Sequence, residues 1–311
     1  MTSSTVPPLP ATSRLALLAA GITVVLWASA FVGIRGVGNA YGPGALALGR
    51  LLVGTITLGA VVAVRRPAWP AGRDLMPILA YGVSWFAAYN IALNAAERHL
   101  DAGTASMLVN LGPVLIAVSA GIILKEGFGR PLMLGSAAAL AGAVVIAAGA
   151  SSAHAVDAVG VGLGVLAAVL YAIGVTLQKP VLARVSALTA TWLGCAVGTI
   201  VCLPFAPQLW SETTRASGRS IAGLAYLGVV PTAIAFTTWA YALARTSAGN
   251  QGATTYLVPV VAILISWAVL GELPPGLSYV GGGLCLVGVA ISRLRHRSAH
   301  PPDRAATARQ S

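Results

Sequence analysis

One permanent charge, Arg50, lies inside a long apolar stretch of the sequence, residues 44–64. A charged side chain in the middle of a membrane-spanning helix costs about 2.5–3.5 kcal/mol on insertion scales, so such residues usually face a cavity or a partner. A guanidinium in a cavity can bind a carboxylate through paired, charge-assisted hydrogen bonds. The alternative is a structural arginine that binds carbonyl groups of a broken neighbouring helix or extends to the membrane surface. Arg50 is therefore a candidate contact for an anionic group of a substrate.

Aromatic and amide side chains form a second set of candidates. Tyr81, Trp85 and Tyr89 are spaced by four residues, so they share one face of a helix, and Asn90 follows directly. Such a face can form the apolar wall of a cavity with polar tips, or alternatively an aromatic stripe at the lipid interface. Trp239 is a weaker candidate of the same kind in the second half of the chain. The sequence thus predicts substrate contacts from Trp85, Tyr89, Asn90 and Trp239.

Two prolines, Pro113 and Pro259, each lie near the middle of an apolar stretch. A proline inside a helix removes a backbone hydrogen bond and frees the carbonyl four residues earlier. Such a break can open polar backbone to a cavity, or it is a simple bend whose free groups bind neighbouring Ser or Thr side chains. Asn110 and Tyr256 each lie three residues before one of these prolines, and we expect both to face the cavity. The resulting wall suits a moderately apolar solute or a zwitterion better than a polyanion.

Three glutamates, Glu97, Glu126 and Glu272, are the carboxylates at the ends of predicted spans. Glu126 and Glu272 could couple transport to protons, or they could pair with basic or backbone groups where helices end. Their place near the membrane surface favours pairing. If transport is linked to protons, we expect the coupling to use one of these three residues, because no histidine lies within a span.

Motifs for other chemistries are missing from the sequence. It contains no GxxxxGK[ST] nucleotide-binding loop, no HExxH and no GxSxG, and no span contains a pair of carboxylates. We therefore predict neither an ATP-driven pump nor an enzyme, with no catalytic residue, no cofactor and no metal site. The formal net charge of +11 could suggest a nucleic-acid partner. Its basic residues lie in short loops and the C-terminal tail, however, so no nucleic acid is expected.

The composition indicates the elements that must position these residues. The chain is 57% hydrophobic and 9% charged, with a mean hydropathy of +0.83, whereas a soluble protein has about 25% charged residues. Apolar stretches of this length can cross a hydrocarbon core of about 30 Å, and they must be helices because backbone groups need partners within the segment. The predicted spans are 15–34, 44–64, 75–96, 102–124, 131–149, 159–178, 187–206, 221–244, 248–270 and 276–292.

An internal repeat organises these spans. Residues 102–146 align without a gap with residues 248–292, 146 positions later, and the alignment keeps a Pro, a Glu and two Gly at the same spacing across two apolar stretches. A repeat with several apolar stretches in each copy indicates a duplicated membrane half. Each half has five spans, an odd number, so the two halves must cross the membrane in opposite senses, as in many secondary transporters. We predict an all-α integral membrane protein with ten transmembrane helices arranged as two inverted five-helix repeats.

Basic residues are concentrated in the loops on one side of this arrangement, the side of both termini. By the positive-inside rule both termini are cytoplasmic, and the protein is a multi-pass protein of the plasma membrane, the inner membrane of a bacterium. The predicted organisation is a cytoplasmic tail (1–14), a first repeat (15–149), a linker outside (150–158), a second repeat (159–292) and a basic cytoplasmic tail (293–311).

The whole pattern resembles the drug/metabolite transporter superfamily, EamA type, over residues 15–292. The resemblance rests on the WASAF sequence at 27–31, on Arg50, and on two copies of AG…P…E that each precede a glycine-spaced span. It implies transport of a small molecule, usually export, by alternating access between the halves, with amino acids, other metabolites or drugs as substrates. The expected partners are that solute and the lipid bilayer, and a homodimer is allowed. The alternatives are a membrane-embedded enzyme and a membrane protein that does not transport.

Overall fold

The computed structural model describes residues 11–99, 108–150, 158–270 and 276–292, and every regular element within these ranges is a helix. The predicted tails and the linker lie almost entirely outside the described residues. The first half contains α1 (Ala11–Val37), α2 (Pro43–Arg65), α3 (Gly72–Tyr81), η1 (Gly82–Ala88), α4 (Tyr89–His99), α6 (Gly112–Ile122) and α7 (Arg130–Ala150). The second half contains α8 (Ala158–Val181), α9 (Ala187–Cys202), η2 (Leu203–Phe205), α10 (Ala206–Arg215), α11 (Gly218–Leu227), η3 (Gly228–Ile234), α12 (Ala235–Leu243), α13 (Ala248–Thr254), α14 (Leu257–Leu270) and α15 (Gly276–Ser292).

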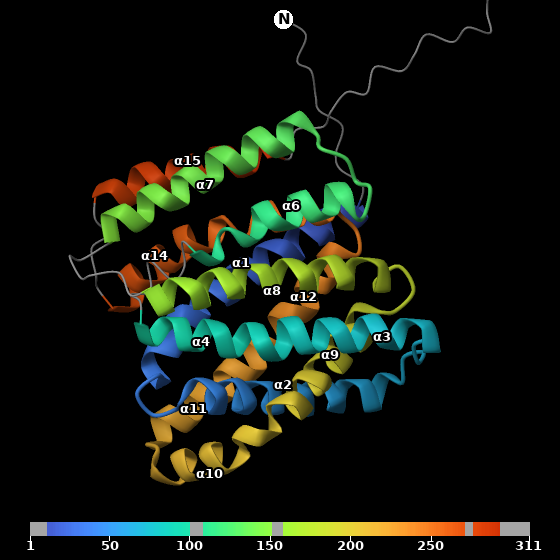
Figure 1. Cartoon of the computed structure of the whole chain (residues 1–311), viewed down its shortest axis with the longest axis vertical. Helices are drawn as coiled ribbons and strands as arrows, with labels where there is room; N and C mark the ends of the chain where they lie inside the picture. Colours follow the sequence, from blue (N-terminus) through green and yellow to red (C-terminus); the bar gives the residue numbers. More distant parts are fainter. Residues whose placement is uncertain (1–10, 100–107, 151–157, 271–275, 293–311) are drawn as a thin grey trace, which may run out of the picture.

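Several of these helices join end to end, so the described residues form ten rods (Figure 1). The joined sets are α3–η1–α4, α9–η2–α10, α11–η3–α12 and, across a turn, α13–α14. Five rods are long and apolar enough to cross a membrane on their own, and shorter apolar helices accompany them. The predicted all-α membrane fold is confirmed. The predicted span 102–124 can be followed only from residue 108 onward.

The two halves run in opposite senses. Figure 1 shows α6 and α14 pointing in opposite directions, and likewise α7 and α15. Each member of these pairs is the repeat equivalent of the other, at the offset of 146 residues. The chain therefore consists of two inverted five-helix repeats, as the odd number of spans in each half requires.

Glycines allow α7 and α15 to pack closely at one edge of the molecule. A side chain at Gly135 would place its first carbon 2.4 Å from the carbonyl oxygen of Gly288, and one at Gly142 would be 2.5 Å from that of Gly281. The offset of 146 exchanges these two contacts, because it relates Gly135 to Gly281 and Gly142 to Gly288. Small residues let helix backbones approach in membranes. The pair thus forms a closely packed, locally two-fold edge.

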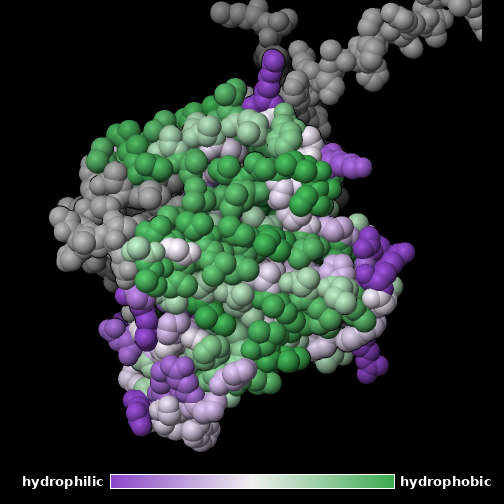
Figure 2. Space-filling model, viewed as in Figure 1, coloured by the Kyte–Doolittle hydropathy of each residue, from purple (hydrophilic) through white to green (hydrophobic). Residues whose placement is uncertain are grey.

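The surface matches the expected lipid environment. Figure 2 shows a hydrophobic band across the middle of the helices, with hydrophilic residues gathered at their two ends. Large apolar side chains on outward faces are exposed, such as Ile56, Leu134 and Val280. In a soluble protein such a surface would mark an interaction site, whereas here it surrounds the bundle where lipid tails would contact it. The protein is a multi-pass membrane protein.

Candidate binding cavity

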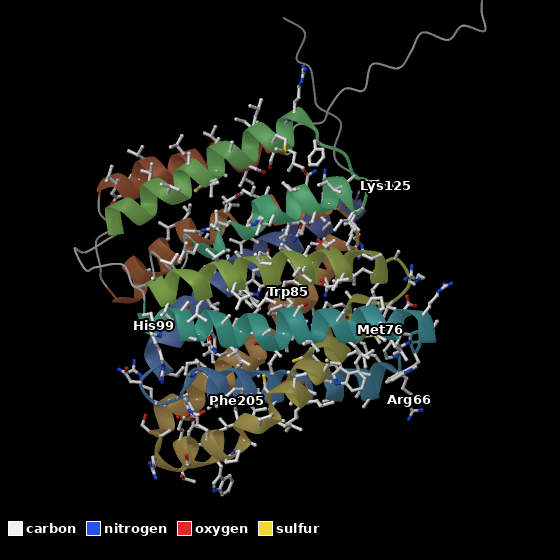
Figure 3. The ribbon with its side chains drawn as sticks, in the orientation of Figure 1. Arg66, Met76, Trp85, His99, Lys125 and Phe205 are labelled. Carbon is white, nitrogen blue, oxygen red and sulfur yellow. The ribbon has the colours of Figure 1, made fainter. Side chains whose placement is uncertain are left out.

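A cavity of about 710 Å³, including its open mouth, lies between the two halves of the chain. Its wall comes from α1, α2, η1 and α4 of the first half, from α8, α12 and α14 of the second half, and from the turns before α6 and α14. Figure 3 places Trp85 midway along the helices, between one end of the bundle marked by His99 and the other marked by Arg66. We call these the His99 end and the Arg66 end. The cavity is lined by Trp27, Ala30, Ile34, Arg50, Trp85, Tyr89, Asn90, Leu93, Val109, Asn110, Tyr171, Phe236, Thr255, Val258 and Pro259.

The cavity lies on the His99 side of Trp85. Leu93 lies two turns after Trp85 along the rod that ends at His99. Arg50 lies two turns into α2, whose first residue, Pro43, accepts a hydrogen bond from the amide of Asn94 and therefore lies at the same end. A solute would therefore reach Arg50 from the His99 end.

A π-helix shapes the first-half wall. The widened turns of η1 interrupt the usual hydrogen-bond ladder, a feature often found at functional sites. Asn90 donates from Nδ2 to the carbonyl of Phe86 over 2.8 Å and so stabilises this segment. Its Oδ1 is buried and has no protein hydrogen-bond partner within the described part of the chain. Asn90 therefore presents a hydrogen-bond acceptor at the cavity wall.

A second π-helix, η3, holds Arg50 in place. Arg50 donates from Nε to the hydroxyl of Thr232 over 3.2 Å. Thr232 in turn donates to the carbonyl of Leu227, five residues earlier, over 2.8 Å. The guanidinium is only 4% exposed, and Tyr89 and Glu97 both interact with it electrostatically. Arg50 thus links α2 of the first half to η3 of the second half and contributes a positive charge to the cavity wall.

Aromatic rings close the cavity toward the Arg66 end. Trp27 is at their centre, with ring centroids 5.0 Å from Trp239, 5.3 Å from Phe236 and 6.3 Å from both Trp85 and Tyr171. These five rings come from four helical segments, and their tilted and edge-on contacts are the favourable geometries for aromatic pairs. They form a continuous apolar layer, which we call the aromatic floor.

The predicted site residues are largely brought together. Those that line the cavity are Arg50, Trp85, Tyr89, Asn90, Asn110 and Pro259. Trp239 is fully buried in the aromatic floor behind Trp27 and does not line the cavity. Tyr256 does not line it either, because its ring is buried in a separate cluster with Ala139, Cys285 and Val289. Pro113 lies in the first turn of α6, away from the lining. That the lining residues bind a substrate stays a prediction.

Sequence reasoning missed nine lining residues, and four of these carry an aromatic ring or a hydroxyl group, namely Trp27, Tyr171, Phe236 and Thr255. Trp27 belongs to the WASAF sequence and could have been included for that reason. Tyr171 and Phe236 are single aromatic residues in apolar helices, and nothing in the sequence shows which side of the helix faces inward. Thr255 is adjacent to the predicted Tyr256, so the helix break was located correctly but its inward residue was not.

At the Arg66 end, Glu126 binds the start of a helix from the other half. Its carboxylate accepts hydrogen bonds from the backbone amide of Ala248 over 2.9 Å and of Gly249 over 3.4 Å, at the N-terminus of α13. Left-handed backbone at Lys125 and Gly127, with φ of 55° and 77°, places Glu126 in this position. A negative charge at a helix N-terminus is stabilising. The expected pairing of Glu126 with a backbone group is confirmed, whereas Glu272 lies outside the described residues.

Two further contacts close the same end. The ammonium group of Lys179, at the end of α8, donates to the carbonyls of Leu243, over 2.7 Å, and Thr246. Arg184 forms an ion pair with the buried carboxylate of Asp74, with a distance of 2.7 Å from Nε to Oδ1. The Arg66 end is therefore sealed by charge-assisted contacts, two of which join the halves, while the cavity opens toward the His99 end.

Comparison with known proteins shows which family has this architecture. The EamA-like transporter family matches residues 14–148 and again residues 158–294. A probable terminal-alkyne amino-acid exporter of Streptantibioticus cattleyicolor is 37% identical over 287 residues, covering 91% of this chain and 96% of that protein. The uncharacterized transporter YdfC of Bacillus subtilis is 33% identical over 279 residues, covering 90% and 91%. A crystal structure that is 21% identical has the same fold, with a TM-score of 0.75 over 91% of this chain.

Proposed function

Because the chain belongs to the EamA-like transporter family, it is a membrane transporter for a small organic solute, and we propose that it exports an amino acid with an apolar side chain. The observation that supports this substrate best is a single guanidinium, Arg50, in a cavity whose other lining residues are mostly aromatic and aliphatic, with two amides and a hydroxyl. Transport through such a cavity needs no bond to be made or broken, so we propose a transporter and not an enzyme.

Each part of an amino acid has a counterpart in the cavity. A carboxylate can bind the guanidinium of Arg50, whose Nε is already fixed by Thr232. An ammonium group can donate to the free Oδ1 of Asn90 and can lie over an aromatic face. An apolar side chain can pack on the rings of Trp27 and Trp85. One positive charge balances one carboxylate, so a polyanion would leave charges unpaired in a largely apolar space.

The similar exporter of S. cattleyicolor supports this substrate class. Its name describes a terminal-alkyne amino acid as the solute, and a terminal alkyne is a narrow, apolar group. This chain shares 37% of its residues over nearly the full length of that protein. An apolar amino acid is therefore consistent with both the lining of the cavity and the named solute of a relative.

The charge distribution supports a cavity that opens to the outside of the cell. Arg66 and Lys125 lie at the Arg66 end (Figure 3), Arg65 directly precedes Arg66, and Arg184 lies there through its ion pair with Asp74. Basic loops favour the cytoplasmic side. Both termini would then be cytoplasmic and the cavity would face outward, so the described conformation is the one that releases solute. Residues 15–149 and 159–292 would be the units that move relative to each other. A homodimer stays a prediction.

Counterflow in proteoliposomes tests the proposal. Vesicles loaded with unlabelled leucine are diluted into labelled leucine, and the same test is run with isoamylamine, which is leucine without its carboxylate. We expect saturable exchange of leucine but not of the amine, because only leucine can pair with Arg50. Equal exchange of both solutes, or no exchange of any apolar amino acid, would overturn the proposed substrate.

A further inference from the structure

Several polar side chains outside the lining of the cavity are buried without all of their hydrogen bonds, among them Gln178, Trp239, Gln251 and Tyr256. Gln178 is 0% exposed, and neither its Nε2 nor its Oε1 has a protein partner within the described residues. The same holds for Nε1 of Trp239, Nε2 of Gln251 and Oη of Tyr256. Burying a polar group without a partner is costly, and such groups are uncommon in native structures. A conformation that exposes these four groups to water or to a solute would provide the missing partners.

Two of the four are repeat equivalents of residues that line the cavity. The offset of 146 relates Leu93 to Trp239 and Asn110 to Tyr256. Leu93 and Asn110 line the cavity, whereas Trp239 and Tyr256 are buried. In an inverted repeat the two halves exchange their environments when the carrier faces the opposite side. Trp239 and Tyr256 would then occupy the positions that Leu93 and Asn110 have in the described conformation.

Some lining residues are equivalent to each other. Asn90 and Phe236 are related by the offset, and so are Val109 and Thr255, and all four line the cavity. These residues therefore lie near the two-fold axis and would remain at the centre of the site in both states. Leu93 and Asn110, which have equivalents outside the lining, belong to one state only.

The two glutamines lie between the floor and the sealed end. Gln178 is one turn beyond Val175 on the face of α8 that also carries Tyr171, on the way to Lys179. Gln251 lies in α13, whose N-terminus Glu126 binds, and its Oε1 is 3.5 Å from the hydroxyl of Thr246. Opening the seal at Lys179 and Glu126 would expose both amides.

We infer that Gln178, Trp239, Gln251 and Tyr256 form the wall of a second solute-binding cavity that opens toward the Arg66 end. The inference rests on the proposed transport function. The second cavity would take the same zwitterionic solute through amide, indole and phenol hydrogen bonds. It would contain no counterpart of Arg50, because the repeat equivalent of Arg50 is Ala196. Arg50 would therefore bind the carboxylate of a solute only in the cavity that faces the His99 end.

Cysteine labelling tests this assignment. Gln178→Cys and Leu93→Cys are treated in vesicles with a charged, membrane-impermeant methanethiosulfonate reagent added from one side or the other. The three native cysteines are buried, so the unsubstituted protein gives the background. We expect Gln178→Cys to react at least about tenfold faster from the Arg66 side, because a buried residue reacts only through opening. Leu93→Cys should show the opposite preference.

Ser136→Cys is the matched control, because Ser136 is also buried without a protein partner but lies on α7, away from the path. It should react from neither side. If Gln178→Cys does not react while leucine counterflow persists, the second cavity is wrong but the transport function stands. If Gln178→Cys reacts and leucine does not exchange, the proposed substrate fails and the second cavity stands.

Gln178→Leu provides an independent measurement. It removes the unpaired amide at similar volume, so it should stabilise the described conformation and raise the apparent Tm by about 2–4 °C. The rate of leucine exchange should fall severalfold, because opening the Arg66 end loses its hydrogen bonds. Affinity measured from the His99 side should not change. A higher Tm with an unchanged exchange rate would overturn the inference.

Discussion

The two halves of this protein share their backbone irregularities but differ in the side chains that use them. The π-helices η1 and η3 occupy equivalent residues, 82–88 and 228–234, at the offset of 146. In η1 the amide of Asn90 binds the carbonyl of Phe86, whereas in η3 the hydroxyl of Thr232 binds the carbonyl of Leu227. The offset relates Phe86 to Thr232 and not to Leu227, so the two halves stabilise their π-helices through bonds at different positions.

The difference between the halves determines what the site can bind. The hydroxyl of Thr232 also accepts a hydrogen bond from Nε of Arg50, while the equivalent of Arg50 in the second half is Ala196. A symmetric backbone allows two opposite conformations to be built from one chain. The single arginine makes these conformations unequal toward a carboxylate. The symmetric backbone therefore allows the change between the two conformations, and the single Arg50 determines which of them binds a carboxylate.

The largest effect is expected where the halves are most alike, at the glycines of α7 and α15. A methyl group at Gly142 would lie 2.5 Å from a backbone oxygen, and one at the equivalent Gly288 would lie 2.4 Å from the backbone nitrogen of Ala139. Each Gly→Ala substitution should therefore lower the free energy of unfolding by about 1–3 kcal/mol, the usual cost of overpacking. Unfolding in detergent, followed by circular dichroism, measures it.

Gly162→Ala is the control for this pair, because Gly162 on α8 has no atom within 4 Å of an added methyl group. It should leave stability unchanged or raise it slightly through helix propensity. Similar losses at Gly142 and Gly288 would support a two-fold edge. A large loss at one and none at the other would show that the halves do not pack equivalently.

Arg50→Ala should give the next largest effect, on binding. It removes charge-assisted hydrogen bonds worth about 1.5–3 kcal/mol, so the apparent affinity for leucine should fall by about 10- to 150-fold, while protein level stays normal. Leucinamide lacks the carboxylate, so any exchange that it shows with the unsubstituted protein should not change. Counterflow with leucine and with leucinamide separates the two cases. An equal loss for both would mean that Arg50 is structural.

The spans and the repeat could be predicted from the sequence because both depend on composition over many residues. The π-helices could not, since the segments GVSWFAA and GVVPTAI contain no residue pattern that requires a wider turn. Asn110 and Tyr256 are repeat equivalents, and both were predicted at the cavity because each lies three residues before a proline, but only Asn110 lines it. A single conformation of an inverted repeat breaks that equivalence, so sequence symmetry alone cannot tell which residue of a pair faces the solute.

A smaller effect is expected at the two ends of the bundle, where carboxylates bind backbone amides across the halves. Glu126 binds the first residues of α13 at the Arg66 end, and Glu212 binds the amide of Gly42, just before α2, over 2.8 Å at the His99 end. Replacing a group that binds the amides of a helix N-terminus costs about 0.5–2 kcal/mol. Glu126→Ala should therefore favour opening of the Arg66 end, and Glu212→Ala should not.

The labelling rate of Gln178→Cys measures this difference between the two ends. Glu126→Ala should raise the labelling rate of Gln178→Cys from the Arg66 side severalfold, and Glu212→Ala should leave it unchanged. Equal acceleration by both substitutions would indicate general loosening of the bundle and would contradict a seal at Glu126.

The smallest effect is expected at Thr232, where the structural and the recognition roles meet. Thr232→Val keeps the shape of the side chain but removes both the bond to the carbonyl of Leu227 and the acceptor for Arg50. Each bond contributes about 0.5–1.5 kcal/mol, so we expect a modest loss of stability and a several-fold loss of leucine affinity. Thr199→Val is the control, because Thr199 makes a similar bond to the carbonyl of Cys195 and does not contact Arg50. It should lower stability alone. If both variants lose affinity equally, the orientation of Arg50 does not depend on its hydrogen bond to Thr232 of η3. The second half would then have no part in positioning the guanidinium of the first half.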